Sequence, residues 1–515
     1  MFGTMKSVFR AAFISAALAL PASAREITVL TYNVENLFDA DKVAIFDDYA
    51  ETSQENAYSP QKALRKMEGI AQVLRTFNEG AGPDIVCFNE FELDFTPDSK
   101  VTDYTAFLEK YKETTAREML TTGLNDKIRG LPVEALLIKH LADEGMEGYH
   151  VAVGADEPDF AALASTDKDV HKKGHKNAVF SKFPITAIKS YPTPDARDVL
   201  EVALEVEGHP LVLFVNHWKS RASDLVAEHT RRFNAKTVRD RLDQIFLADP
   251  ATDVVVTGDF NSQYKQTAAH PHMGKTGVND ILGSQGDEKV TATATNFSLY
   301  NLWHELPEES QRRSDHFNGK WGTLMQIMLT PGLYDYKGVQ YVDNSFRVVA
   351  LKGVNSVTSL NLPRRWSNMG GGSGTSDHFP VAASFRTVDD NDAGKRLALE
   401  SPGTPAPNGD LVPVFAGLKP SELPEFTAEI ADDAEAKRGE IFRVKGTISS
   451  KKPLLIEVHG QEYSLWTSDK DSPALKPVRQ LDKGAEVELI GILSDHKGRN
   501  QFLVEDPAWV LKAGA

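Results

Sequence analysis

Four apolar segments of the chain end, on their carboxyl side, in polar or ionisable residues. The segments are ITVLTYN, DIVCFNE, LVLFVNHWK and DVVVTGDFN, and they end at Asn33, at Glu90, at His217 with Lys219, and at Asp259 with Asn261. Helical patterns alternate with strand-like segments, which indicates a layered α/β fold. Ligand crevices in such folds commonly lie beyond the carboxyl ends of strands, so we expect these side chains to converge on one pocket.

A fifth segment adds further polar groups. In SDHFPVAASF, Asp377 and His378 stand directly before an apolar run, and the glycine-rich stretch MGGGSGT precedes them. Glycines allow the backbone to approach a ligand closely. We therefore expect this segment to reach the same pocket.

The predicted pocket is rich in oxygen and has no cysteine. It combines the carboxylates of Glu90, Asp259 and Asp377 with side-chain amides of Asn33 and Asn261. This ligand set favours Mg²⁺, Mn²⁺ or Ca²⁺ over a structural zinc. A hard cation beside two histidines indicates phosphoryl chemistry, in which the metal neutralises phosphate charge, a carboxylate orients water and an imidazole serves the leaving side.

The chain has 515 residues, of which 41% are hydrophobic, so it can bury one large core and a smaller one. We predict a first domain over residues 25–386, a Pro-, Gly- and Asp-rich linker over 387–425 and a β-rich domain over 426–515. A helix is predicted over 61–78. Residues 98–150 are predicted to form a helical insertion over one edge of the fold.

The first 24 residues are typical of a signal peptide. Lys6 and Arg10 precede the apolar run AAFISAALAL, which ends in PASA. The run is too short to span a bilayer, and the small residues disfavour the alternative of a buried helix. We expect cleavage after Ala24 and export to a periplasm or to the medium. No other segment is apolar enough to cross a membrane. The single cysteine, Cys87 in DIVCF, is predicted to be a buried thiol.

Six blocks of the sequence resemble the endonuclease/exonuclease/phosphatase superfamily. They are TYNVENLFD, DIVCFNEFE, KNAVFSKFPI, VNHWKSR, TGDFNS and SDHFP, and they follow the order of that superfamily over about residues 27–386. The resemblance implies a four-layer α/β sandwich, with two packed mixed β-sheets flanked by helices. It also implies an active site at one edge of strand ends.

The resemblance implies roles for individual residues. Glu90 would be a metal ligand with Asn33 beside it, and Asp377 would ligate or support the metal. Among the implied catalytic residues, Asp259 would position and activate water, and Asn261 would hold a phosphate oxygen. His378 would contact the phosphate. His217 occupies the place of a second histidine in the nuclease branch.

Three further residues are expected to contact substrate. They are Asn177 in KNAVFSKFP, and Lys219 and Arg221 in NHWKSR. For each of them a solvated or turn-stabilising role remains the alternative.

One position departs from the superfamily pattern. Where related proteins have an aspartate that orients the catalytic histidine, the segment GTLMQIMLTPGL has Met325. Loss of that carboxylate would remove the hydrogen bond that fixes the tautomer and basicity of the histidine. Asp315 in RRSDHFNGKW is a possible substitute. From the sequence, Met325→Asp is expected to increase turnover.

The C-terminal segment resembles an OB-type barrel. Such barrels often bind single strands or oligosaccharides through a basic, aromatic face. Residues that could supply that face are Lys451, Lys452, Tyr463, Trp466 and Arg499. Trp466 and Trp509 are equally open to the interpretation that they belong to the barrel core.

Three functions follow from these observations. The first is an exported metal-dependent phosphodiesterase, an endonuclease acting on nucleic acid with Mg²⁺, Mn²⁺ or Ca²⁺. The second is the same chemistry on a phospholipid headgroup or a phosphomonoester, and the third is a metal- or ligand-binding protein impaired by Met325. A formal net charge of −16 makes the chain a poor general trap for polyanions, so the substrate must be held by local cations. We expect a monomer.

Overall fold

The computed structural model of the chain describes residues 26–41, 58–155, 174–293, 297–307, 311–357, 361–368, 371–388, 420–434, 437, 441–467, 473–496, 499–504 and 507–513. The predicted signal peptide and residues 389–419 of the predicted linker lie outside these ranges. Both predictions, and the predicted domain boundaries, therefore stay predictions. Within these ranges no helix has the length and apolarity needed to cross a bilayer.

Two seven-stranded sheets form the α/β region. The first has strand order β14-β18-β1-β2-β4-β3, with β15 also paired to β18. The second has order β5-β6-β7-β8-β13-β10-β9. The strands of the first sheet are β1 (Ile27–Leu37), β2 (Ile85–Glu92), β3 (His150–Val153), β4 (His175–Ser181), β14 (Gly338–Tyr341), β15 (Arg347–Val348) and β18 (Val381–Val388). Those of the second are β5 (Ile185–Tyr191), β6 (Val199–Val206), β7 (His209–His217), β8 (Val254–Asp259), β9 (Ser284–Gln285), β10 (Leu299–Asn301) and β13 (Met325–Leu329).

Both sheets are mixed, and each contains a parallel pair that ends in predicted site residues. β1 runs parallel to β2 with Asn33 opposite Asn89, and β7 runs parallel to β8 with His217 opposite Asp259. Parallel neighbours finish at the same edge of a sheet. This register brings the polar strand ends of each sheet together.

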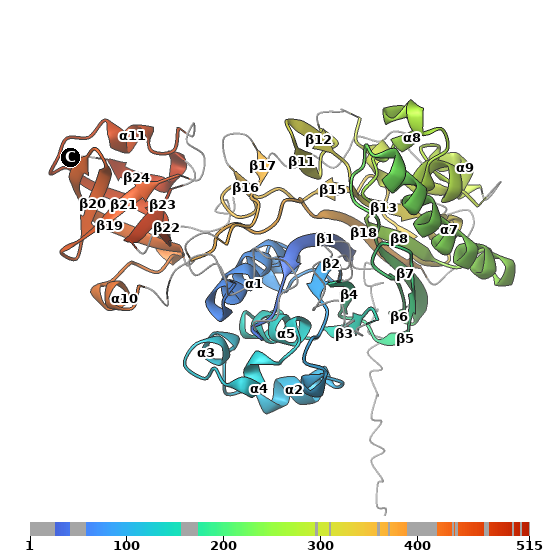
Figure 1. The fold of residues 1–515 in the computed structure, drawn as a ribbon, viewed down its shortest axis with the longest axis horizontal. Helices are drawn as coiled ribbons and strands as arrows, with labels where there is room; N and C mark the ends of the chain where they lie inside the picture. Colours follow the sequence, from blue (N-terminus) through green and yellow to red (C-terminus); the bar gives the residue numbers. More distant parts are fainter. Residues whose placement is uncertain are drawn as a thin grey trace, which may run out of the picture.

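Helices cover the outer faces of both sheets (Figure 1). The long ones are α1 (Pro60–Leu74), α5 (Val133–Asp143) and α7 (Leu225–Ala248). One apolar core lies between α1, α5 and the first sheet, a second lies between the sheets, and a third lies between α7 and the second sheet. These layers confirm the predicted four-layer α/β sandwich. Cys87 is a buried free thiol in the core between the sheets, as predicted.

The helix predicted over 61–78 is confirmed as α1. It starts where Ser59 accepts a hydrogen bond from the backbone of Lys62, with Pro60 in the first turn. The insertion at 98–150 supplies α5 and three short helices, α2 (Tyr104–Lys110), α3 (Ala116–Leu120) and α4 (Asp126–Arg129). Their apolar side chains join the core on the outer face of the first sheet, so the insertion covers a face and not only an edge.

The C-terminal region forms a closed five-stranded β-barrel. Its order is β19-β20-β21-β23-β22, and a pairing of β22 with β19 closes it; β24 adds to β22. The strands are β19 (Ile441–Lys451), β20 (Leu454–Val458), β21 (Gln461–Trp466), β22 (Glu486–His496), β23 (Arg499–Leu503) and β24 (Val510–Ala513). The predicted small all-β barrel is confirmed, while its OB-type classification stays a prediction.

The aromatic residues of the barrel divide between core and surface. Tyr463 is buried in the barrel core, so its ring is not available for the predicted binding face. Trp466 is 54% exposed, and the interpretation as a core residue is wrong for it. Trp509 is buried in the barrel core, which confirms the interpretation of this residue as a core residue.

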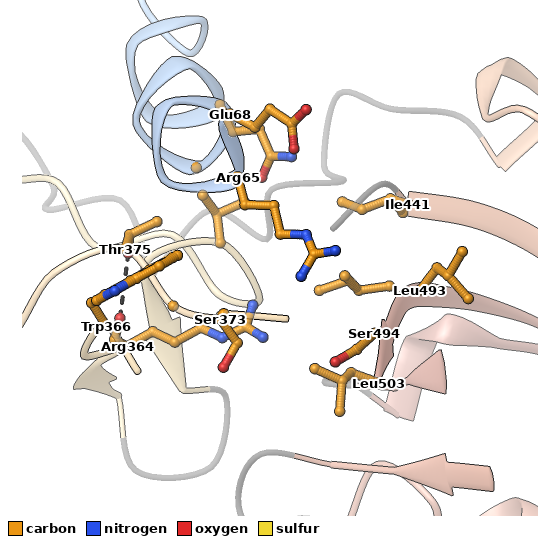
Figure 2. A pocket seen from close by; sticks show the side chains of 16 residues that line it. Arg65, Glu68, Arg364, Trp366, Ser373, Thr375, Ile441, Leu493, Ser494 and Leu503 are labelled. Atoms are coloured by element: carbon orange, nitrogen blue, oxygen red, sulfur yellow. Dashed lines mark hydrogen bonds between the residues drawn. The ribbon is translucent and has the colours of Figure 1, made fainter. Parts of the chain in front are cut away.

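A small cavity of about 50 Å³ lies between the barrel and the α/β region. Figure 2 shows Arg65 of α1 pointing into it from one side, with barrel residues facing it. The labelled barrel residues are Ile441, Leu493, Ser494 and Leu503. Charged and polar groups line one side, so the apolar cores of the two regions are not continuous here.

Gly258 sets the close approach of β7 and β8 next to the site. Its φ is +133°, and a Cβ at this position would collide with the backbone oxygen of Asn216. Only glycine combines this dihedral with this spacing. The glycine of TGDFN therefore lets the chain place His217 beside Asp259.

Gly258→Ala is expected to cost more than about 4 kcal/mol in the free energy of unfolding, because strain adds to a backbone collision. Urea titration of the purified variants measures this cost. Gly208 is the matched control: its φ is +89° but a Cβ there would meet open space. Gly208→Ala should cost about 1–3 kcal/mol, from backbone strain alone. Equal costs for the two variants would contradict the role assigned to Gly258.

Candidate active site

The four predicted strand ends meet at one edge of the sandwich. The Asn33 side chain donates one hydrogen bond of 2.9 Å to Glu90 Oε1 and another of 3.0 Å to Asp259 Oδ2. His217 Nε2 lies 3.6 Å from Glu90 Oε1 and 3.7 Å from Asp259 Oδ2. Asn33 and Glu90 belong to the first sheet, and His217 and Asp259 to the second. The site is therefore built across both sheets.

The backbone at this edge is conformationally unusual. Glu90 has φ +67° and Asn261 has φ +48°, in the left-handed region that non-glycine residues seldom adopt. Asn261 is held by its backbone N–H, which donates to Asp259 Oδ1 at 2.8 Å, and by its side chain, which donates to the carbonyl of Trp218 at 3.0 Å. Such strained residues cluster at functional sites because the surroundings fix them.

The SDH segment is docked on the end of β1. The Ser376 hydroxyl donates to the Asn33 carbonyl at 2.6 Å, and the His378 backbone N–H donates to Ser376 Oγ at 3.0 Å. His378 Nδ1 lies 2.7 Å from Asp377 Oδ1, and its Nε2 lies 3.5 Å from Asp259 Oδ2. As predicted, this segment joins the strand ends. Asp377 contacts the histidine ring, a role that was not predicted for it.

Carboxylates surround His378. Burial alone would lower the pKa of His378, but the negative charges of Asp377, Asp259 and Asp315 outweigh it and raise that pKa well above its usual range. Asp315 lies in β11 (Asp315–Phe317) and forms a backbone bridge with His378. The residue suggested as a substitute thus reaches the site. These charges favour the imidazolium form of His378.

Met325 is fully buried in the core between the sheets, opposite Asp259 in the β8–β13 register. A carboxylate there would lie in apolar surroundings beside another buried carboxylate, which is costly. His378 already has Asp377 and Asp315 near it. The increase in turnover predicted from the sequence for Met325→Asp is therefore no longer expected, and loss of stability is expected instead.

The residues present fit a divalent cation. Oxygen or nitrogen atoms of Glu90, His217 and Asp259 lie within 4.8 Å of one another. Burial opposes ionisation of Glu90, but the field of His175, His217 and Arg197 with the bond from Asn33 lowers its pKa below the usual range. Burial, with Arg197, lowers the pKa of His217, which favours the neutral imidazole that can ligate metal. Burial raises the pKa of Asp259, a shift that a bound cation would oppose.

Asn33 and Asp377, the other predicted metal residues, stand at the margin of this group. The Asn33 side-chain oxygen accepts from the backbone N–H of Glu35 at 2.9 Å, so its amide N–H groups face the carboxylates. Asp377 is one-third exposed and bonds to His378. In this arrangement both residues position the site around Glu90 and Asp259.

The predicted substrate contacts differ in exposure. Asn177 is 1% exposed, and its side chain bonds to Asn89 and to two backbone carbonyls, so it supports the site from behind. Lys219 is half-buried and Arg221 is exposed, in the loop that follows β7. Arg231 of α7, which is fully buried, donates to the backbone carbonyls of both. Arg231 therefore fixes the backbone of the loop that carries Lys219 and Arg221.

Two buried residues of the site were missed from the sequence. Glu35 accepts hydrogen bonds of 2.7 Å from Arg365 Nε and from the backbone of Trp366. Lys66 donates to the Glu35 carbonyl and lies 4.9 Å from the centre of the Trp366 ring. Burial raises the pKa of Glu35 to about 7 and lowers that of Lys66 to about 8. Together these contacts tie the segment before SDH to the end of β1. The sequence carries a signal for Glu35, because this residue lies two positions after Asn33 in the block TYNVENLFD.

Comparison with known protein families supports this geometry. Residues 170–387 match the model of the Endonuclease/Exonuclease/phosphatase family. The matched segment therefore resembles this family of phosphate-ester hydrolases. The match supports a phosphate-ester hydrolase, and a divalent metal serves the family's reaction. The matched residues include His217, Asp259 and His378, and the fold brings Asn33 and Glu90, which precede them, to the same edge. A search of curated proteins finds no match.

The solved structures that resemble the chain do so only distantly. TDP2 from C. elegans is 12% identical, with a TM-score of 0.37, and the match covers 70% of this chain and 75% of that chain. D. rerio TDP2 complexed with single strand DNA product is 13% identical, with a TM-score of 0.37, covering 70% and 99%. A family protein from Bacteroides thetaiotaomicron is 14% identical, with a TM-score of 0.35, covering 71% and 99%. Similarity at this level supports no argument about substrate.

Asp315→Asn is expected to reduce turnover at neutral pH by about tenfold or more, because it removes a charge that keeps His378 protonated. The pKa of His378 should fall, so the alkaline limb of the pH–rate profile should move to lower pH. The profile of kcat over a range of pH measures this. Asp240→Asn, on the exposed face of α7, is the control and should leave the profile unchanged. An unmoved alkaline limb in Asp315→Asn would contradict the assigned role.

Proposed function

We propose that the chain is a divalent-metal-dependent phosphodiesterase that hydrolyses nucleic acid as an endonuclease. The observation that carries the proposal is that His217 lies within 4 Å of both Glu90 and Asp259, and His378 within 4 Å of Asp259, in a chain whose residues 170–387 match this family. A second histidine at position 217 is the feature by which the site resembles the nuclease branch.

The chain's own residues supply most of the chemistry. A cation held by Glu90, His217 and Asp259 would neutralise phosphate charge and polarise the phosphoryl group. Asp259, whose Oδ1 is fixed by the Asn261 backbone, orients water for attack on phosphorus and takes its proton. His378, kept cationic by its carboxylates, donates a hydrogen bond to the phosphoryl oxygen as negative charge builds there. The bond from phosphorus to the leaving oxygen then breaks, and the leaving oxygen takes up a proton from solvent.

Substrate binding would depend on a few local cations. Arg221 is exposed at the rim with φ +74°, and Lys219 lies beside it. Both lie within four residues after His217 in the chain, so we expect a phosphate next to the scissile bond to lie within their reach. On the barrel, exposed Trp466 offers a ring on which a base could stack. These features favour a polymeric substrate over a phosphomonoester or a lipid headgroup.

Export is a further part of the proposal. It rests on the pattern of residues 1–24 in the sequence, and it places the enzyme in a periplasm or outside the cell. Mass spectrometry of the protein recovered from the expressing cells should find an N-terminus at Arg25. An N-terminus at Met1 in the exported fraction would contradict the assignment.

Asp259→Ala is expected to lower the hydrolysis of plasmid DNA or RNA by at least about 100-fold, because it removes a cation ligand and the group that orients water. The assay uses residues 25–515 with Mg²⁺, Mn²⁺ or Ca²⁺ and with EDTA, and follows nicking on gels. Asp240→Ala, on exposed α7, is the control and should retain full activity.

Parallel assays separate the alternatives. A chromogenic phosphomonoester and phospholipid vesicles test the other phosphate esters. Cleavage of these but not of nucleic acid would contradict the proposed substrate. Folded protein that binds metal without hydrolysing any ester would indicate the impaired binding protein.

A further inference from the structure

A second cluster of carboxylates lies away from the active site. One oxygen each of Glu288, Glu305 and Asp343 lies within 4.8 Å of the other two. Glu288 opens α9 (Glu288–Ala292), Glu305 closes the short helix η6 (Leu302–Glu305) after β10, and Asp343 follows β14. β10 belongs to the second sheet and β14 to the first, so the cluster bridges the two sheets.

The register of the first sheet separates this cluster from the active site. Tyr341, at the end of β14, pairs with Phe385, and Phe385 pairs with Ile27 at the start of β1. The catalytic group gathers at Asn33, six residues further along β1. The two clusters therefore lie toward opposite ends of the same strand and do not share ligands.

Two of the three carboxylates, those of Glu288 and Glu305, are deeply buried. Glu288 is 6% exposed and Glu305 is 2% exposed. Among the residues that the structure describes, neither forms an ion pair with lysine or arginine. Burial, together with Asp343, raises the pKa of Glu288 to about 7, and burial raises the pKa of Glu305 well above its usual range. Buried like charges this close cannot all ionise unless a cation joins them.

The two oxygens of Glu305 differ in their hydrogen bonding. Tyr341 donates to Glu305 Oε2 at 2.5 Å, and Tyr334 donates to Glu288 Oε1 at 3.0 Å. Glu305 Oε1, by contrast, is buried and accepts no hydrogen bond of ordinary geometry from the described part of the chain, although the backbone N–H of Phe346 approaches this carboxylate. Hydroxyls that fix one oxygen of a carboxylate while the other stays available are typical of the support around metal ligands.

We propose that Glu288, Glu305 and Asp343 bind a Ca²⁺ ion that joins the two sheets at this edge. All three donors are carboxylate oxygens, which a hard cation prefers, and Ca²⁺ tolerates the irregular geometry of ligands from three separate connections. The ion would partner Glu305 Oε1 and remove the repulsion among the three charges. Its role would be structural, because no predicted catalytic residue lies in the cluster.

Terbium luminescence tests the proposal, because Tb³⁺ binds Ca²⁺ sites and nearby aromatic rings sensitise its emission. Tyr334 and Tyr341 bond directly to the cluster, so excitation of tyrosine should report this site. The experiment uses residues 25–515 carrying Glu90→Gln and Asp259→Asn, which remove the active-site ligands. We expect saturable emission that Ca²⁺ displaces, and at least about tenfold weaker Tb³⁺ affinity in Glu305→Gln.

The matched control is Asp253→Asn, at another buried carboxylate, 6% exposed, whose pKa burial raises to about 8. It should leave Tb³⁺ affinity unchanged. Thermal unfolding adds an independent measurement: Ca²⁺ should raise the Tm of the parent but not of Glu305→Gln or Glu288→Gln. In EDTA, Glu305→Gln should be at least as stable as the parent, because it removes a buried repulsion. Absence of saturable emission, or equal affinity in the parent and Glu305→Gln, would overturn the proposal.

Discussion

The Asn33 side-chain amide is the interaction on which the active site depends. It donates to Glu90 in its own sheet and to Asp259 in the other, so a single group fixes the distance between the two sheets at their catalytic edge. The Asn33 carbonyl also accepts from Ser376, which docks the segment that carries His378. A charge-assisted hydrogen bond in a buried setting is stronger than a neutral one. Asn33 therefore both positions the site residues and stabilises the charges of the Glu90 and Asp259 carboxylates.

Around that amide the fold concentrates charge that would be unfavourable elsewhere. Burial raises the pKa of Asp259 and lowers that of His217, whereas three neighbouring carboxylates raise the pKa of His378. The two histidines beside Asp259 are thus shifted toward opposite protonation states. Opposite protonation states of two histidines are what a site needs if one ligates metal and the other stabilises phosphate charge. The cost of burying these groups is offset by the three apolar cores of the sandwich.

Much of this site could be predicted because strand ends obey simple rules. The apolar runs before Asn33, Glu90, His217 and Asp259 are buried strands, and parallel pairing brings their ends to one edge. The roles of contacts between distant segments were harder to predict. Asp315 reaches His378 only because β11 forms a bridge with the SDH segment, and no local pattern indicates that pairing. From the sequence, Met325 is interpreted as the replacement of a functional aspartate, but in the fold its side chain packs in the core between the sheets.

Residues that support the site from behind were also hidden from sequence reasoning. Arg231 lies on a helix whose charged residues resemble a solvated face, yet it is fully buried and holds the loop after β7. From the sequence, Asn177 was expected to contact substrate. An amide side chain in a sequence motif can serve either as a substrate contact or as a structural group, and the motif alone does not distinguish the two. Only the packing of β4 against β2 and β7 shows that its side chain bonds to protein groups.

Anomalous diffraction from crystals grown with Mn²⁺ would test the central claim most directly. The account predicts a peak at the catalytic edge, about 2 Å from a carboxylate oxygen of Glu90 and within ligand reach of Asp259. A peak at that edge would establish that the strand ends of two sheets form one metal centre. Active crystals with Mn²⁺ bound only at other carboxylates would contradict the account.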